Sequence, residues 1–399
     1  MPGSLVARVV RVAHIVHHYG KLSESFIPDS LEELERQGAE AWVATLSVEG
    51  RQTYPFPPDA RLLVCPPPSL ARRVFDRLRR RTGTDRFAAH VAARLSPLAP
   101  AVVHAHFGWG AASGVAVAGR LGVPAVATFH GTDITVVPVD RPQARGWRGP
   151  RGHPYARPFE RLDAAIAVSG FIERRLRALG FAGPVEIVPA GVRLDRLPFR
   201  GTEPPADGPR ILYVGRLNPQ KGLDLLLEAM PRVLAAQPTA RLEVIGGGPS
   251  RAELEALAER LGVAGRTTFL GALPRREDVI DGLRRAHVLV MPSRTMADGA
   301  AEGSPVVSKE GQAVGVPLVA TDTGGMAETV PPEHRADLVP GDDPPALAEA
   351  VTRLLADPRA RAERARRARA WVEQEFDSRG LARRTVDLYA RLAGPQGAS

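Results

Sequence analysis

Short apolar runs rich in valine and isoleucine alternate with segments that place apolar residues at helical spacing, and this alternation continues along the whole chain. Strands of this kind, each followed by a helix, are typical of parallel sheets covered by helices on both faces. In the first half, the pattern predicts strands at 9–17, 41–46, 61–65, 101–105, 125–129 and 164–168. In the second half, it predicts strands at 211–215, 242–246, 267–271, 287–292 and 317–322.

The two series of strands are separated by a segment between residues 195 and 210 that is rich in proline and glycine and has no hydrophobic period. Such a segment is typical of a connection between domains. We therefore expect an α/β chain with two doubly wound, Rossmann-like domains facing a central cleft, where open sheets bind ligands. The expected bounds are 1–200 and 201–375, with a last helix at 376–399 packing back across toward the first domain.

Composition excludes several other classes of protein. The 399 residues carry a net charge of +9, but the basic residues are spread along the chain and only 5% of residues are aromatic, so no nucleic-acid partner is expected. The single cysteine, Cys65, allows no disulfide within the chain and fits a reducing, cytoplasmic location. No apolar stretch is long enough to span a bilayer, although peripheral contact with an anionic membrane at its inner face stays open.

Two glutamates eight residues apart, Glu302 and Glu310, enclose a segment in which Gly303 and Pro305 precede a predicted helix. Proline is preorganised for the first turn of a helix, and the free amides of that turn can bind an anion or sugar hydroxyls. Taken alone, the segment is equally compatible with a capped helix that carries an ordinary surface glutamate.

The surrounding order of elements is more specific. A strand, Pro292-Ser293, a loop, the segment 302–310 and the run PLVATDTGGMAE together resemble the signature of retaining glycosyltransferases of family 4, which have the GT-B fold. The resemblance implies that Glu302 contacts the donor sugar and that Glu310 binds the nucleotide ribose. The usual Gly-Phe-Gly after the first glutamate is replaced here, as in the colanic-acid and exopolysaccharide branch. The expected donor-binding segment after Glu302 is Gly303, Ser304, Pro305 and Val306.

A basic motif follows the first strand of the second domain. Gly215 allows a close approach of the backbone, and Arg216 and Lys221 supply two cations for a diphosphate. The motif resembles the Gly-Arg-Leu-x-x-x-Lys-Gly diphosphate site of the family, whereas without that context a solvated turn explains it. Gly247 lies in a glycine-rich turn after the next strand, which lacks the spacing of a dinucleotide fingerprint and is expected to line the nucleotide pocket.

In the first domain, His130 lies at the end of a strand, in the run His-Gly-Thr-Asp that ends at Asp133. Resemblance to the family places His130 against the donor hexose, with Asp133 nearby and His106 in the wall of the adjacent pocket. A histidine at this position can also be an ordinary core or loop residue. The first strand ends near Gly20, expected beside the diphosphate, where the run Leu-Ser-Glu-x-Phe-Ile supplies the acceptor-side candidates Ser23 and Glu24, for which a helix cap is the alternative.

An arginine-rich stretch at 137–158 directly follows the His130 motif. Its position suggests a loop of the acceptor site in which Arg141 and Arg145 hold an acidic or hydroxyl-rich acceptor. A solvated loop is the alternative interpretation.

No Asp-x-Asp motif occurs in the chain, so the departing diphosphate is expected to be stabilised by Arg216, Lys221 and helix amides, with no catalytic metal and no cofactor. The resemblance therefore implies a retaining hexosyltransferase with a nucleotide-sugar donor, in the first instance a UDP-sugar, and an α-linked product on a glycan or small natural product. A GT-B-like epimerase or phosphorylase and a non-catalytic sugar-nucleotide-binding module are the alternatives. The oligomeric state stays open.

Overall fold

The computed structural model describes residues 9–21, 24–50, 53–65, 83–137, 153–201 and 208–394. The chain forms two compact units, of which the first comprises Met1–Gly191 with Ser378–Ser399 and the second comprises Val192–Asp377. The units therefore divide earlier than the expected position 200, and the last helix belongs to the first unit. The physical reason is burial, because Val192, Leu197 and Phe376 pack in a core of the second unit.

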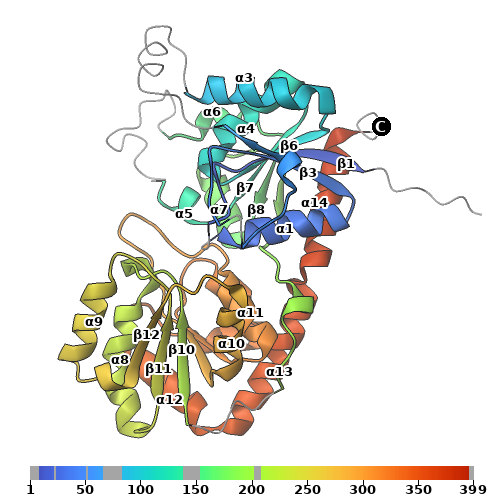
Figure 1. Cartoon of the computed structure of the whole chain (residues 1–399). Coiled ribbons are helices and arrows are strands. Elements are labelled where there is room, and N and C mark those ends of the chain that lie inside the picture. Colours follow the sequence, from blue (N-terminus) through green and yellow to red (C-terminus); the bar gives the residue numbers. More distant parts are fainter. Residues whose placement is uncertain are drawn as a thin grey trace, which may run out of the picture. The chain divides into compact units, whose positions relative to one another are not determined.

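The first unit is built on a parallel sheet of seven strands in the order β5-β3-β1-β6-β7-β8-β9 (Figure 1). Its strands are β1 (Val10–Ile15), β3 (Ala39–Thr45), β5 (Leu62–Val64), β6 (Val102–His106), β7 (Ala125–Phe129), β8 (Ala164–Ala167) and β9 (Val185–Ile187). A separate two-stranded ribbon pairs β2 (His18–Tyr19) with β4 (Ser47–Val48). The short strands β2 (His18–Tyr19), β4 (Ser47–Val48) and β9 (Val185–Ile187) are absent from the sequence prediction.

Helices cover both faces of this sheet. Alternate residues of the strands belong to two different cores, as Ala13 and Ile15 of β1 pack with α3 and α4 while Val12 packs with α1 and α14. The helices of the unit are α1 (Phe26–Arg36), α3 (Gly83–Leu95), α4 (Gly108–Leu121), α5 (Thr132–Thr135), α6 (Ala156–Phe159), α7 (Gly170–Ala178) and α14 (Ser378–Ala393).

The second unit repeats the plan with a parallel sheet of five strands in the order β12-β11-β10-β13-β14. Its strands are β10 (Arg210–Val214), β11 (Arg241–Ile245), β12 (Thr267–Gly271), β13 (Val288–Met291) and β14 (Leu318–Ala320). One core packs against α8, α9 and α12, and the other against α10, α11 and α13. These helices are α8 (Leu223–Ala236), α9 (Arg251–Arg260), α10 (Arg276–Arg285), α11 (Val306–Val314), α12 (Pro344–Ala356) and α13 (Pro358–Glu375).

Each predicted strand corresponds to an observed one, with ends that differ by a few residues. The helix expected to begin near Pro305 is α11, for which Pro305 is the N-cap residue. The helix expected at 376–399 is α14, which spans Ser378–Ala393. Within the part of the chain that the structure describes, no helix combines the length and apolar character needed to cross a bilayer.

Candidate active site

The strand order of the second unit places one strand pair where ligands are expected. The chain passes from β10 to β11 on one side and later returns to β13 on the other, so the switch point of the sheet lies between the carboxyl ends of β10 and β13. The run from Gly215 to Lys221 follows β10, and Pro292 and Ser293 follow β13. Residues of both loops therefore meet at one edge of the sheet.

Three polar side chains from these loops are in contact. The Lys221 ammonium lies 2.5 Å from Oε1 of Glu302, and the Ser293 hydroxyl donates to the same oxygen at 2.7 Å. The side chain of Glu302 is buried, whereas a quarter of the Lys221 side chain is exposed. Burial by itself raises the pKa of Glu302, but the ammonium and the hydroxyl outweigh it and hold the pKa below its usual range. Glu302 is therefore a carboxylate at neutral pH.

Glycines let the backbone close around this cluster. Gly222, directly after Lys221, has φ +65°, and a Cβ there would lie 1.9 Å from the carbonyl oxygen of Pro292. Gly324 has φ +56°, and a Cβ there would lie 2.2 Å from the carbonyl oxygen of Glu302. Glycine is required at both positions, because φ is positive and because a Cβ would clash with a neighbouring carbonyl oxygen. The loops that carry Lys221 and Glu302 are thus fixed by backbone packing.

The glycine-rich turn after β11 packs against the turn after β10. The amide of Gly215 donates to Ile245, and a Cβ on Gly246 would lie 1.8 Å from the carbonyl oxygen of Gly215. The carbonyl of Gly247 accepts from the amide of Leu217 at 2.9 Å. Gly215 and Gly247 are therefore neighbours through their turns, while their expected contact with a nucleotide stays a prediction.

The segment Gly303 to Val306 leads into α11. The N-cap residue of this helix, Pro305, makes no side-chain hydrogen bond to its first amides. The buried Lys309 of the helix turns back, and its ammonium donates to the hydroxyl of Ser304 at 2.9 Å and to the Ser304 carbonyl at 3.3 Å. Burial lowers the pKa of Lys309 to about 7, against the opposing charge of Glu310. The turn after Glu302 is thus fixed by hydrogen bonds from Lys309 of α11, the helix that follows it.

The two remaining predicted residues of this unit differ in their surroundings. Glu310 is 7% exposed and pairs with Arg276 of α10 at 2.5 Å. Arg216 is exposed, and its guanidinium makes no ion pair with any residue that the structure describes. Its backbone is fixed, since the Tyr213 hydroxyl donates to the Arg216 carbonyl at 3.1 Å. The structure therefore joins Lys221 with Glu302 directly and leaves the Arg216 side chain open to solvent.

In the first unit, His130 and Asp133 form a turn at the carboxyl end of β7. The buried Asp133 carboxylate accepts from the amides of His130 at 3.1 Å, Gly131 at 2.7 Å and Gly108 at 2.7 Å. Burial raises the pKa of Asp133 to about 6 although these amides oppose it. Asp133 thus holds the turn that presents His130, and its direct contact with a donor stays a prediction.

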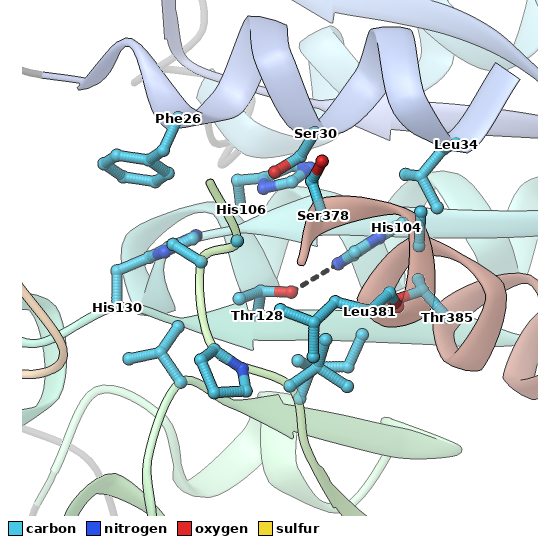
Figure 2. Close-up of a pocket in the computed structure, with 17 residues that line it drawn as sticks. Phe26, Ser30, Leu34, His104, His106, Thr128, His130, Ser378, Leu381 and Thr385 are labelled. Atoms are coloured by element: carbon cyan, nitrogen blue, oxygen red, sulfur yellow. Dashed lines mark hydrogen bonds between the residues drawn. The ribbon is translucent and has the colours of Figure 1, made fainter. Parts of the chain in front are cut away.

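His130 borders a pocket of the first unit that Figure 2 shows between α1, α14 and the strand ends. His104 and His106 of β6 line the same pocket, and both nitrogens of His104 are hydrogen-bonded, to Thr128 and Tyr389. Burial lowers the pKa of His106 to about 4 and that of His130 well below its usual value. These rings are therefore neutral at physiological pH.

The other acceptor-side predictions are only partly described. Gly20 has φ +85° and packs on the backbone of Glu49, and Glu24 lies 3.7 Å from the Lys21 ammonium. The backbone conformation and the packing on Glu49 therefore require a glycine at position 20 independently of any ligand. Ser23, Arg141 and Arg145 lie outside the described residues.

Sequence reasoning gave no role to three residues that shape the site. Ser293 is named only within the family signature, although its position after β13, at the same sheet edge as Lys221, could have indicated its role. Arg276 has no comparable signal, because its partner Glu310 is 34 residues away on another helix. Tyr155, whose hydroxyl donates to the Asp133 carbonyl, comes from the far end of the arginine-rich stretch. Such contacts depend on the tertiary fold.

Comparison with known proteins covers both units. Residues 24–196 match the family model described as glycosyltransferase family 4, and residues 198–371 match the model described as glycosyl transferases group 1. The sucrose-phosphate synthase of Thermosynechococcus elongatus has a similar structure, with a TM-score of 0.74 over 96% of this chain and 99% of that one. Its sequence identity of 24% makes it evidence for the fold alone.

Two curated relatives are closer in sequence. The GDP-mannose-dependent alpha-(1-6)-phosphatidylinositol monomannoside mannosyltransferase of Mycolicibacterium smegmatis is 32% identical over 300 residues, which cover 70% of this chain and 75% of the relative. The colanic acid biosynthesis glycosyltransferase WcaL of Escherichia coli is 31% identical over 268 residues, covering 66% of this chain and 63% of the relative. With two matching family models and these relatives, the chain belongs to the family 4 glycosyltransferases of the GT-B fold.

Proposed function

We propose that this glycosyltransferase moves a hexosyl group from a nucleoside-diphosphate sugar to an acceptor hydroxyl with retention, so that an α-linked donor gives an α-linked product. The observation that carries the proposal is the contact of Lys221 and Ser293 with Glu302 at the switch point of the second sheet. In this cluster, a cation that can bind a phosphate is in direct contact with a carboxylate that can bind sugar hydroxyls. Neither the epimerase nor the binding module is favoured by the relatives.

In the proposed reaction, the bond between C1 of the sugar and the diphosphate oxygen breaks, and its electron pair leaves with the diphosphate. The acceptor oxygen bonds to C1 on the same face, and its proton passes to the departing phosphate oxygen. Negative charge grows on the diphosphate, where cations in fixed positions contribute most to the rate. Lys221 is suited to this task because an ammonium has three donors and only one is used by Glu302.

Glu302 is suited to hold the sugar. Both of its hydrogen bonds fall on Oε1, and no residue in the described parts of the chain bonds to Oε2. A carboxylate oxygen that is ionised and unshared accepts strongly from a hydroxyl. We therefore assign Oε2 to a hydroxyl of the donor hexose, and a covalent adduct on Glu302 is not part of the mechanism.

The other proposed donor contacts are assigned in the same way, with cations and amides for the diphosphate and carboxylates for hydroxyl groups. The uncapped start of α11 presents amides to an anion, and the exposed Arg216 adds a second cation for the diphosphate. Glu310 is proposed to bind the nucleotide ribose, and its ion pair with Arg276 fixes the position of its carboxylate. These groups stabilise the leaving group without a metal ion. The proposed donor-binding residues lie in the second unit apart from Gly20, His130 and Asp133, of which His130 is assigned to the hexose by the family pattern.

The acceptor is proposed to bind the first unit, near His130. A glycan or a small natural product remains the proposed acceptor, and peripheral contact with an anionic membrane stays part of the proposal. UDP is the proposed nucleotide, while the relative from Mycolicibacterium smegmatis is named for GDP-mannose. The donor panel must therefore contain both bases.

The test is a panel of UDP- and GDP-hexoses incubated with the chain and simple sugar acceptors in the presence of EDTA. Mass spectrometry detects transfer, and proton NMR of the product gives its anomeric configuration. We expect one donor series to yield a product with the configuration of the donor. A product of inverted configuration refutes the retaining mechanism, and an isomerised donor without transfer refutes the transferase.

A further inference from the structure

We propose that Phe107 and Trp109 form a stacking subsite for a sugar ring of the acceptor, next to His130. The inference rests on the proposed function, because it names the class of acceptor that the first unit takes. Both residues lie where β6 passes into α4, so they belong to the edge of the sheet that carries His130.

The backbone of Phe107 is the first argument. With φ +64° and ψ 151°, it occupies a region that is essentially reserved for glycine. A residue with a side chain persists there only when the surroundings impose the conformation, and such residues cluster at functional sites. A glycine at this position would remove the strain, so the presence of a phenyl ring calls for a reason of its own.

Three contacts impose this conformation. The amide of Phe107 donates to the carbonyl of Thr128 at 2.8 Å, and the amide of Gly110 donates to the Phe107 carbonyl at 2.9 Å. The next amide, of Gly108, donates to Asp133, the residue that also holds the His130 turn. A Cβ on Gly108 would lie 2.6 Å from the ring of Tyr155, so a glycine is needed directly after Phe107. Phe107 and His130 are therefore positioned by the same carboxylate.

The rings form one continuous aromatic surface. The Phe107 ring lies 4.5 Å from the His130 ring, and Phe26 of α1 lies 4.9 Å from His130. Figure 2 shows Phe26 and His130 together at the end of the pocket away from α14. Phe107 also stacks on Trp109, with 4.6 Å between the ring centroids and an angle of 14° between the rings. The surface thus extends from His130 to an exposed indole.

Trp109 is 45% exposed, although it is one of the largest apolar side chains. Among the described residues, no arginine or lysine covers the rings of Phe26, Phe107 or Trp109. The negative face of an indole attracts groups with partial positive charge, and the C–H face of a pyranose ring is such a group. A sugar stacked here would carry its hydroxyls at its edge, beside the buried Nε2 of His130, which has no described partner.

The test compares Trp109→Ala and Trp109→Phe with Leu270→Ala, an exposed apolar residue of the second unit. The transfer assay uses sugar acceptors (methyl α-glucoside, methyl α-mannoside and maltotriose) and a phenolic acceptor, 4-methylumbelliferone. We expect Trp109→Ala to raise the KM of a sugar acceptor about tenfold, which is the order of one aromatic contact, and Trp109→Phe to restore most of it. The donor KM should change less than twofold.

Phe107→Gly separates a binding role from a structural one. If the phenyl ring is retained for the acceptor, the variant should raise the acceptor KM, while relief of strain and loss of the packing of the ring on the core change Tm in opposite directions. A lower Tm with an unchanged acceptor KM overturns the inference. So does an unchanged sugar KM in Trp109→Ala, or an effect confined to the phenolic acceptor.

Sugar binding without turnover distinguishes this failure from failure of the proposed function. The same sugars are titrated while tryptophan fluorescence is recorded, and we expect quenching in the native chain that Trp109→Phe abolishes. No quenching by any of the sugars overturns the subsite. Absence of transfer from every donor, with quenching intact, overturns the proposed transferase and leaves the sugar subsite standing.

Discussion

The ion pair of Lys221 with Glu302 permits a prediction whose size follows from burial. In Lys221→Met, Glu302 keeps Ser293 but loses its counter-charge, while its side chain stays 7% exposed. Breaking a fully buried pair costs about 3–5 kcal/mol and a surface pair contributes about 0–1 kcal/mol. Since a quarter of the Lys221 side chain is exposed, water screens part of the charge, and we expect a loss of about 2–3 kcal/mol in the free energy of unfolding at pH 7.

Glu302→Gln and the double variant complete a thermodynamic cycle. Glu302→Gln should cost about 1 kcal/mol, because the remaining Lys221 ammonium reaches water and Ser293 keeps an acceptor. The double variant removes the unpaired charge as well, so it should cost about 2 kcal/mol in total, no more than Lys221→Met alone, and the coupling energy is expected at about 1–2 kcal/mol. Urea unfolding of the four proteins at pH 7 measures each term.

The pH dependence of stability tests the direction of the pKa shift of Glu302. The lowered pKa of Glu302 means that the pair stabilises the native chain above the unfolded pKa of about 4.3 and loses this contribution as the pH falls through the native pKa. In Lys221→Met, burial without an ammonium raises the pKa of Glu302. The gap in stability between the native chain and Lys221→Met should therefore shrink as the pH falls from 7 to 4.5. A coupling energy below about 0.5 kcal/mol, or a gap independent of pH, would refute the reasoning.

Three further predictions follow from single residues. Arg216→Ala should lower kcat about 100-fold through the loss of one cation at the leaving group, with Tm unchanged because the side chain is exposed; an altered Tm would contradict its assignment. Gly222→Ala should unfold at much lower urea than Gly262→Ala, since both have positive φ but only the Gly222 Cβ meets Pro292; equal losses would mean that strain alone decides. Lys309→Met should be more stable than the native chain at pH 6, by up to about 4 kcal/mol. This gain should decline between pH 7 and 10, because the lowered pKa of Lys309 makes the native chain more stable as the pH rises through that window. A gain that does not change with pH would refute the reasoning.

Much of the architecture was predictable from sequence, because it depends on local pattern. The positions of β10 and β13 follow from apolar runs, and residues that follow neighbouring parallel strands must meet at one edge. The contact of Lys221 with Glu302, 81 residues apart, is therefore within reach of sequence reasoning, and the family resemblance is confirmed by both matching models.

Other features required the tertiary structure. Asp133 was expected near the donor, yet its carboxylate is occupied by three amides, which no spacing in the sequence reveals. The backbone of Phe107 is imposed by hydrogen bonds from separate elements, so its residue type alone predicts an ordinary conformation. The division of the units at Val192 also depends on which core buries Leu197, a choice that apolar character does not decide.

The most direct test of the account is the rate of nucleoside-diphosphate release in EDTA, measured with the best donor and acceptor for the native chain and for Lys221→Met. If cationic side chains take up the charge of the departing diphosphate, the native chain turns over without divalent ions and Lys221→Met loses about 100- to 1000-fold in kcat. Turnover that appears only when a divalent ion is added, or equal rates for the two proteins, would contradict it.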